Sequence, residues 1–154
     1  MTMRTGRDLK RISRELRAMD DKEIKKRFRK ELRAAAAPMV PAVRAAIRQI
    51  PSKRGYSADG LRARMAAATK LEVRTVGKDA GVRIRVDGRK MPDKQKALQS
   101  YMEGLKRWRH PVFGSDVWVQ QKPHPYFFRT VDPMGARTRV KVITVIDQVA
   151  KDIS

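Results

Sequence analysis

The sequence predicts an α+β fold with a long amphipathic helical arm at the N-terminus, a β-hairpin with a short edge strand, and a C-terminal helix packed on the sheet. Apolar residues recur at steps of three and four over residues 7–50, and the same spacing returns over 135–153. Between them, apolar and polar residues alternate in two runs joined by a glycine-bounded loop. We expect a basic helical arm over residues 1–51 and an α+β core domain over 52–154.

The N-terminal arm is predicted to contain two or three helical segments. Its first apolar stripe consists of Leu9, Ile12, Leu16 and Met19. Asp20 and Asp21 follow as candidate N-caps for a second helix, because their side chains can accept from unpaired backbone N–H groups. Pro38 and Pro41 each remove a backbone donor, so a continuous helix should kink or stop there. The apolar stripe is thin, which suits docking against another subunit or a sheet.

A β-hairpin is predicted over residues 71–87. Residues 71–76 and 82–86 alternate with period two, and the loop 77–81 between them begins and ends with glycine. The face of the hairpin that should point outward carries three arginines, Arg74, Arg83 and Arg85.

The rest of the chain is predicted to hold a helix, an edge strand and a final helix. Asp93 is a candidate cap for the first helix, which Gly104 weakens and His110-Pro111 ends; its apolar side consists of Ala97, Leu98, Tyr101, Met102 and Leu105. The run 117–119 is short and lies among prolines, as in an edge strand. Residues 139–146 contain enough β-branched residues for a strand, but the length of the periodic stretch favours a helix.

The charge is large and uneven. Lys and Arg number 37 against 16 Asp and Glu, which gives a net charge of +21. Residues 1–33 carry +7, residues 34–109 carry +12, and residues 110–154 carry only +2. A charge of this size implies a polyanionic neighbour or an assembly that compensates it, although a solvated arginine-rich surface is an alternative. The nearly neutral last third holds most of the aromatic residues, so we expect it to be specialised for packing.

Several classes of protein and of site are excluded or disfavoured. The chain has no cysteine, which excludes disulfides, thiolate metal sites and cysteine nucleophiles. No apolar run approaches the roughly 20 residues that span a membrane. The first residues lack the apolar region of a signal peptide, so we expect a soluble protein made in the cytoplasm.

Catalytic and metal-binding patterns are also not found. His110 and His124 each precede a proline and have no nearby pair of carboxylates, so they do not form a metal site. Gly77 and Gly81 bracket a hairpin turn instead of a phosphate-binding loop. We therefore expect no enzyme activity, no metal and no cofactor.

Basic residues cluster in the second half of the arm. If the chain contacts DNA, we expect contacts with phosphates and no readout of bases, because no known reader motif is present. A solvated helix face is an equal alternative, since the cations are expected to surround the helix. The cluster consists of Lys22, Lys25, Lys26, Arg27, Arg29 and Lys30.

The segment 108–128 resembles a family of phage proteins. It contains a His-Pro-Val-Phe-Gly loop, a Trp-Val-Gln-Gln run and a Pro-Tyr-Phe-Phe turn; the residues that carry the motif are His110, Pro111, Phe113, Gly114, Trp118, Pro125, Phe127 and Phe128. This combination resembles the tail-component family (neck or tail-completion proteins) of long-tailed bacteriophages, typified by a lambdoid coliphage of the Hong Kong type. In such proteins a basic N-terminal helix and a hairpin precede the motif, and a terminal helix follows it. The motif residues are expected to pack in the core and loops, with Phe127 or Phe128 in the core. Pro133-Met134-Gly135 departs from the pattern, because it should interrupt the terminal helix.

The resemblance implies a structural virion protein of the head–tail junction or upper tail, assembled in the host cytoplasm. Such proteins form rings, often sixfold, around the DNA path, and their partners are the connector or stopper, the tail terminator and the tail tube. Six copies would carry about +126, so DNA or acidic neighbours must compensate the charge. We expect the three hairpin arginines and part of the basic cluster to face the lumen or an acidic partner. The alternative is a nonspecific DNA-binding protein that contacts the phosphate backbone and binds no membrane.

Overall fold

The computed structural model is a mixed α+β structure, as the sequence predicts. It describes residues 5–18, 21–52, 60–75, 80–92, 95–111 and 116–153. Contacts divide them into two compact units. The first unit holds the described residues of Met1–Pro41, Lys70–Arg85 and Pro133–Ser154, and the second those of Ala42–Thr69 and Val86–Asp132. The predicted arm, residues 1–51, therefore contributes to both units.

The arm contains three helices, α1 (Thr5–Ala18), α2 (Lys22–Ala36) and α3 (Met39–Arg48). Asp21 caps α2 as predicted, since its side chain accepts from the backbone N–H groups of Glu23 and Ile24 at 2.9 Å. The helices break at residues 37–38, as the prolines predict. Pro41 is tolerated because it lies in the first turn of α3, where backbone donors have no partner within the helix. Met19, Asp20 and the side chain of Leu9 lie outside the described part.

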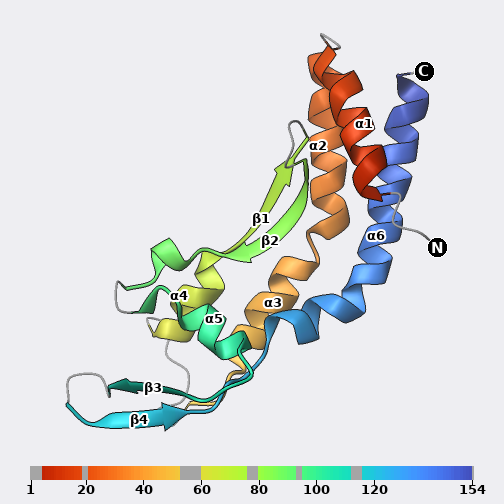
Figure 1. Ribbon diagram of the computed structural model, residues 1–154. Coiled ribbons are helices and arrows are strands. Elements are labelled where there is room, and N and C mark those ends of the chain that lie inside the picture. Colours follow the sequence, from red (N-terminus) through yellow and green to blue (C-terminus); the bar gives the residue numbers. More distant parts are fainter. Residues whose placement is uncertain are drawn as a thin grey trace. The chain divides into compact units, whose positions relative to one another are not determined.

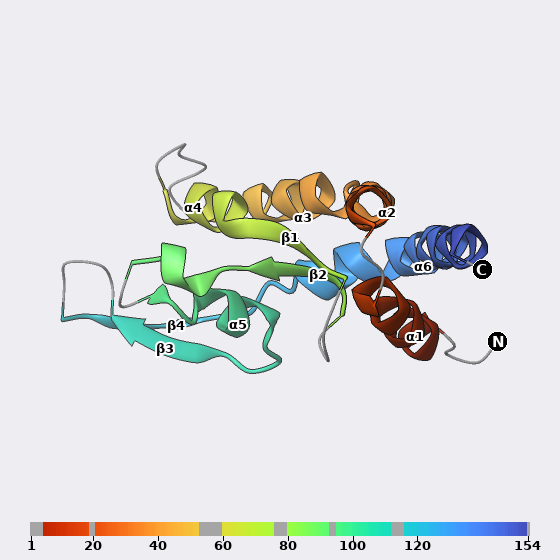
Figure 2. The same cartoon turned by 90° about the horizontal axis from the view of Figure 1, so that it is seen from above.

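The core of the first unit is enclosed on four sides. Figure 2 shows α1, α2, the C-terminal part of α6 (Phe127–Asp152) and the hairpin of β1 (Thr69–Arg74) and β2 (Gly81–Val86) around it. Val73 and Val82 of the hairpin pack against the core. Each thin helical stripe thus covers one side of a shared core, which consists of Ile12, Leu16, Phe28, Leu32, Ala35, Val142, Ile146 and Val149.

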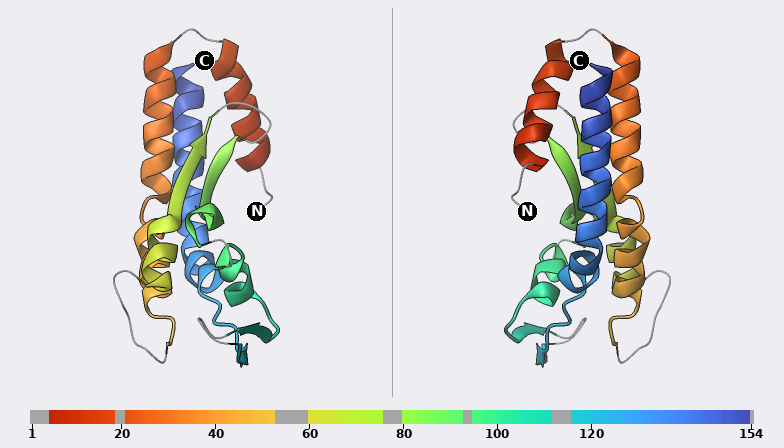
Figure 3. Two further views of the ribbon diagram at one scale, coloured as in Figure 1. Left: turned by 90° about the vertical axis from the view of Figure 1, so that its left-hand side faces the viewer. Right: turned by 90° about the vertical axis from the view of Figure 1, so that its right-hand side faces the viewer.

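The C-terminal stretch is a helix, as its length predicts. One face of α6 enters the first core, whereas Val140 is 61% exposed, which fits helical spacing and not a strand. The predicted interruption at Pro133-Met134-Gly135 is wrong, because α6 runs through Pro133. A proline inside a helix removes one backbone hydrogen bond, and the neighbouring turns can continue when packing holds them. Figure 3 shows the C-terminal part of α6 beside α1 and α2 from two sides.

The second unit is built from short elements around its own core. These are α4 (Leu61–Ala68), a 3-10 turn η1 (Gly88–Lys90), α5 (Leu98–Glu103), β3 (Trp108–Pro111) and β4 (Trp118–Gln121), all labelled where visible in Figure 1. Residues of α3, α4 and α5 supply the core together with residues that follow α3, follow η1 and precede α6: Val43, Ile47, Ile50, Met65, Ala66, Met91, Met102 and Tyr126.

The structure corrects the predicted end of the middle helix. Its candidate cap, Asp93, lies outside the described residues. The helix does not extend to His110-Pro111, because α5 ends at Glu103 with Gly104 as an extended C-cap. The following residues form β3, which pairs with β4 in antiparallel register, Arg109 opposite Gln120 and Pro111 opposite Trp118. The burial of Trp108 and His110 alternates with the exposure of Arg109 and Pro111, so the segment has period two. The predicted edge strand is confirmed as β4.

We expect Gly88→Ala to lower the free energy of unfolding by about 1–3 kcal/mol. A Cβ at Gly88 would lie 2.5 Å from the backbone oxygen of Lys96 and 2.6 Å from Nε2 of Gln99. The matched control is Gly135→Ala in α6, where a Cβ would meet nothing within 4 Å. This control should raise stability by about 0.5–1 kcal/mol, because alanine favours helix over glycine. Urea unfolding followed by circular dichroism measures the free energy of unfolding of both variants. Equal changes in Gly88→Ala and Gly135→Ala would contradict the predicted clash at Gly88.

Candidate functional site

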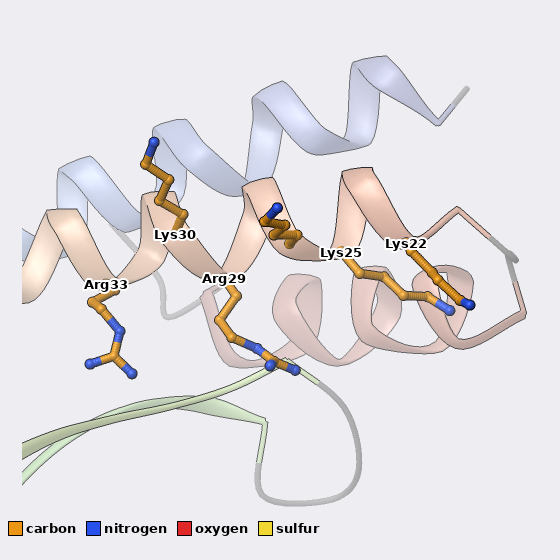
Figure 4. A pocket seen from close by; sticks show the side chains of 6 residues that line it. Lys22, Lys25, Arg29, Lys30 and Arg33 are labelled. Carbon is orange, nitrogen blue, oxygen red and sulfur yellow. The ribbon is translucent and has the colours of Figure 1, made fainter.

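The most strongly charged surface lies on α2 in the first unit. Among the described residues, those that line an open hollow of about 380 Å³ are all cations: Lys22, Lys25, Lys26, Arg29, Lys30 and Arg33. Five of them are labelled in Figure 4, where they extend from one helix. Successive residues of an α-helix are turned by about 100°, so these positions share an arc of roughly 140°. We call this surface the α2 cationic face.

The sequence predicted five of these residues and misplaced one. Arg27 was grouped with them, but it lies off the arc and forms ion pairs with Glu31 (3.8 Å) and with Asp152 of α6. The positive charge of Arg27 is therefore compensated by acidic residues of the same unit. Arg33 was missed, although steps of three and four from Lys26 through Arg29 lead to it. The expectation that the cations surround α2 is corrected, because Phe28 and Leu32 occupy the buried side of the helix.

The α2 cationic face is largely uncompensated. Within the part of the chain that the structure describes, five of its residues form no ion pair: Lys22, Lys26, Arg29, Lys30 and Arg33. All five are exposed. Clustered like charges without acidic partners raise the positive potential at the surface and attract anions.

The hairpin arginines belong to the same unit. Because Val73 and Val82 face the core, alternation places Arg74, Arg83 and Arg85 on the opposite face, as predicted. Arg74 and Arg83 are exposed, whereas Nε of Arg85 lies 3.5 Å from a carboxylate oxygen of Glu72. The charge of Arg85 is thus partly compensated, and Arg83 is the stronger candidate for an external anion.

A different surface covers the open face of the β3–β4 sheet in the second unit. Arg109, Pro111, Trp118 and Gln120 share this face by register, and all are exposed. The Arg109 guanidinium lies 5.7 Å from the centre of the Trp118 ring, within the range of a cation–π contact. The expectation that Trp118 packs in the core is wrong, since its side chain is 56% exposed on the side of the sheet away from the core.

The inner face of the same sheet holds His110 in place. Its Nε2 lies 2.9 Å from Oε1 of Gln121, and its Nδ1 lies 3.0 Å from the carbonyl oxygen of Pro111. Trp108 stacks on Tyr101 with ring centres 5.6 Å apart. In the described residues, no three His, Cys, Asp or Glu side chains gather where they could hold a metal ion. Phe113 and Gly114 of the motif lie outside the described residues.

The Pro-Tyr-Phe-Phe segment forms the start of α6. Pro125 precedes the helix, Phe127 packs against the second core as expected, and Phe128 is 60% exposed because it lies on another side of the helix. The carboxylate of Glu103 accepts from the backbone N–H groups of Tyr126 and Phe127, each at 2.6 Å. The sequence did not predict this cap, because Glu103 is 23 residues away from Tyr126 and no local motif joins them.

Exposed apolar side chains gather in the second unit. Among the described residues they include Leu61, Tyr101, Leu105, Val117, Trp118, Val119 and Phe128, whereas Val140 belongs to the first unit. The last third of the chain is therefore not wholly specialised for packing, in contrast to the expectation. The chain carries a cationic surface on one unit and apolar exposure on the other.

In comparisons with known proteins, no family model, no curated protein and no solved structure matches the chain. Among the described helices, none has the length and apolar character needed to cross a bilayer.

Proposed function

We propose that this chain is a structural subunit of the head–tail junction or upper tail of a long-tailed bacteriophage, a neck, tail-completion or connector ring protein of the virion. The motif in residues 108–128 supports this, as does the order of elements: basic helices, hairpin, Trp-containing strand and long terminal helix. The proposed partners are further copies of the chain, in a ring that is most simply sixfold, and the neighbouring connector or stopper, tail terminator and tail tube proteins.

The open face of the β3–β4 sheet is the observation that carries this proposal. Trp and Arg are the residues that most often dominate protein interfaces, and Trp118 and Arg109 lie together on this face. In the described part of the chain this sheet has two strands, so each strand there has an edge without a partner strand, which can pair with another chain. A subunit that buries this face against a neighbour would remove exposed apolar surface from water.

The proposal predicts that Trp118→Ala weakens assembly. The purified full-length protein should form rings in negative-stain images and a defined oligomer in size-exclusion chromatography with light scattering. Removal of a central Trp from an interface typically costs about 2 kcal/mol or more, so dissociation should begin at a roughly 30-fold higher protein concentration. The monomer fold should persist, because the side chain is largely exposed.

The control for this experiment is Val140→Ala, which removes a side chain of similar exposure, 61%, from the first unit. It should leave the oligomer unchanged. A wild-type protein that stays monomeric at high concentration, or a Trp118→Ala variant that assembles like the wild type, contradicts the proposed assembly.

The second candidate is a free, nonspecific DNA-binding protein, and the α2 cationic face favours it. This alternative predicts tight binding of a DNA duplex by an isolated monomer. Oligomeric state separates the two candidates, because the first requires rings and the second does not.

A further inference from the structure

We infer that the α2 cationic face binds the phosphate backbone of double-stranded DNA without reading its bases. The inference rests on the proposed function for its setting, a ring around a DNA path, and it names the surface of the subunit that contacts the DNA. The surface itself can be tested on the isolated protein.

The composition of the face indicates phosphates as the ligand. Protein–protein interfaces are depleted in lysine and have an apolar centre, whereas the described residues that line this hollow are all Lys or Arg. On the apolar side of α2, Phe28 and Leu32 are fully buried in the core and Ile24 packs against it. This side of the helix cannot supply an apolar centre to a protein interface. For the same reason α2 cannot insert into a lipid surface, since an interfacial helix needs an exposed apolar side.

The length of the face matches a run of phosphates. From Lys22 to Arg33 the helix rises about 16 Å, at 1.5 Å per residue. Duplex DNA carries one charge per about 1.7 Å of its axis when both strands are counted, so a duplex of this length holds about ten phosphates, about five on each strand. Flexible lysine and arginine side chains can reach phosphates over this distance without a fixed register, which favours contacts independent of base sequence.

The fold holds the face outward. Arg27, on another side of α2, pairs with Asp152 of α6, and Asp21 caps the first turn. Phe28 and Leu32 fix the rotation of the helix, because both are fully buried. Binding therefore does not require α2 to fold or turn, and the loss of conformational freedom is confined to the cationic side chains.

The test is the binding of a fluorescent DNA duplex by the full-length protein over a series of salt concentrations. The variant Lys26→Gln, Arg29→Gln, Arg33→Gln removes three charges from the centre of the face. The control Arg137→Gln, Arg139→Gln, Lys141→Gln removes three exposed charges from α6 in the same unit. Both triple variants have the same net charge, and glutamine keeps the helix propensity of Lys and Arg.

The α2 variant is expected to bind at least tenfold more weakly near 0.1 M salt and to reduce the slope of log affinity against log salt by about 2.7, close to 0.9 per lost phosphate contact. The control variant should change the slope by much less. Two duplexes of different sequence should bind equally, since no bases are read.

Three outcomes overturn the inference. One is an absence of duplex binding at low salt, and another is an equal loss in both triple variants, which would mean that net charge alone governs binding. The third is that the α2 substitutions weaken the binding of polyglutamate or of anionic vesicles but leave the binding of the duplex unchanged. Melting curves verify that each variant is folded. Ring images of the same proteins test the proposed function separately, so that rings without duplex binding would overturn only this inference.

Discussion

Phe28→Ala is expected to lower the free energy of unfolding by about 3–5 kcal/mol, the range for loss of a buried phenylalanine. Phe28 is completely inaccessible to solvent in α2, in the core that α1, α6 and the hairpin share with it. Truncation leaves a cavity that the surrounding helices can fill only in part. Because small domains are stable by only about 5–15 kcal/mol, this change is large.

The control for Phe28 is another phenylalanine of the same chain. Phe128 is 60% exposed, so Phe128→Ala should cost less than about 1 kcal/mol. Urea unfolding followed by circular dichroism measures both variants. Phe28→Leu, with an intermediate loss, keeps the comparison possible if the alanine variant does not fold. Equal effects at the two phenylalanines would contradict the description of the first core.

The contrast between these two residues shows what sequence patterns can predict. Ile24, Phe28 and Leu32 follow one another at steps of four, so a helix wheel already places Phe28 on the buried side. Residue types and spacing within a short segment also predict the Asp21 cap and the alternating strands of the hairpin. It fails to choose between Phe127 and Phe128, because adjacent helical residues differ by 100° and the buried direction depends on which elements lie nearby.

Non-local contacts explain the remaining errors. Trp118 was expected in the core because aromatic residues usually are, but the outer face of a two-stranded sheet has no second layer in the described residues. The ion pair of Arg27 with Asp152 joins residues 125 positions apart, so helical spacing could place Arg27 outside the arc of its neighbours but could not show that its charge is paired within the fold. The strand β3 was missed for a similar reason, because its pairing with β4 stabilises it more than local propensity does.

Glu103→Ala is expected to lower the free energy of unfolding by about 3 kcal/mol, because it removes a charged acceptor from two backbone N–H groups. These groups belong to Tyr126 and Phe127, at the start of α6, where helix N–H groups have no partner within the helix. The negative charge also lies at the positive end of the helix dipole. The cap therefore fixes where α6 begins and joins it to α5.

Glu15→Ala is the matched control. Glu15 forms an exposed ion pair with Arg11, one turn away on α1. Exposed pairs of this spacing contribute only about 0.3–0.5 kcal/mol. Urea unfolding compares the two alanine variants under identical conditions. If the free energy of unfolding falls by the same small amount in both variants, Glu103 does not stabilise the start of α6.

Tyr126 reports on the same contact through its titration. Burial raises the pKa of its phenol above the ordinary value, and the charge of Glu103 raises it further. Since the folded state keeps this proton where the unfolded chain releases it, the free energy of unfolding should fall as pH rises above about 10. Glu103→Gln should lower the pKa of Tyr126 but leave it raised, because burial remains. Phenolate absorbance measures the shift, with Tyr126→Phe identifying the signal, and an unchanged titration in Glu103→Gln would contradict the contact.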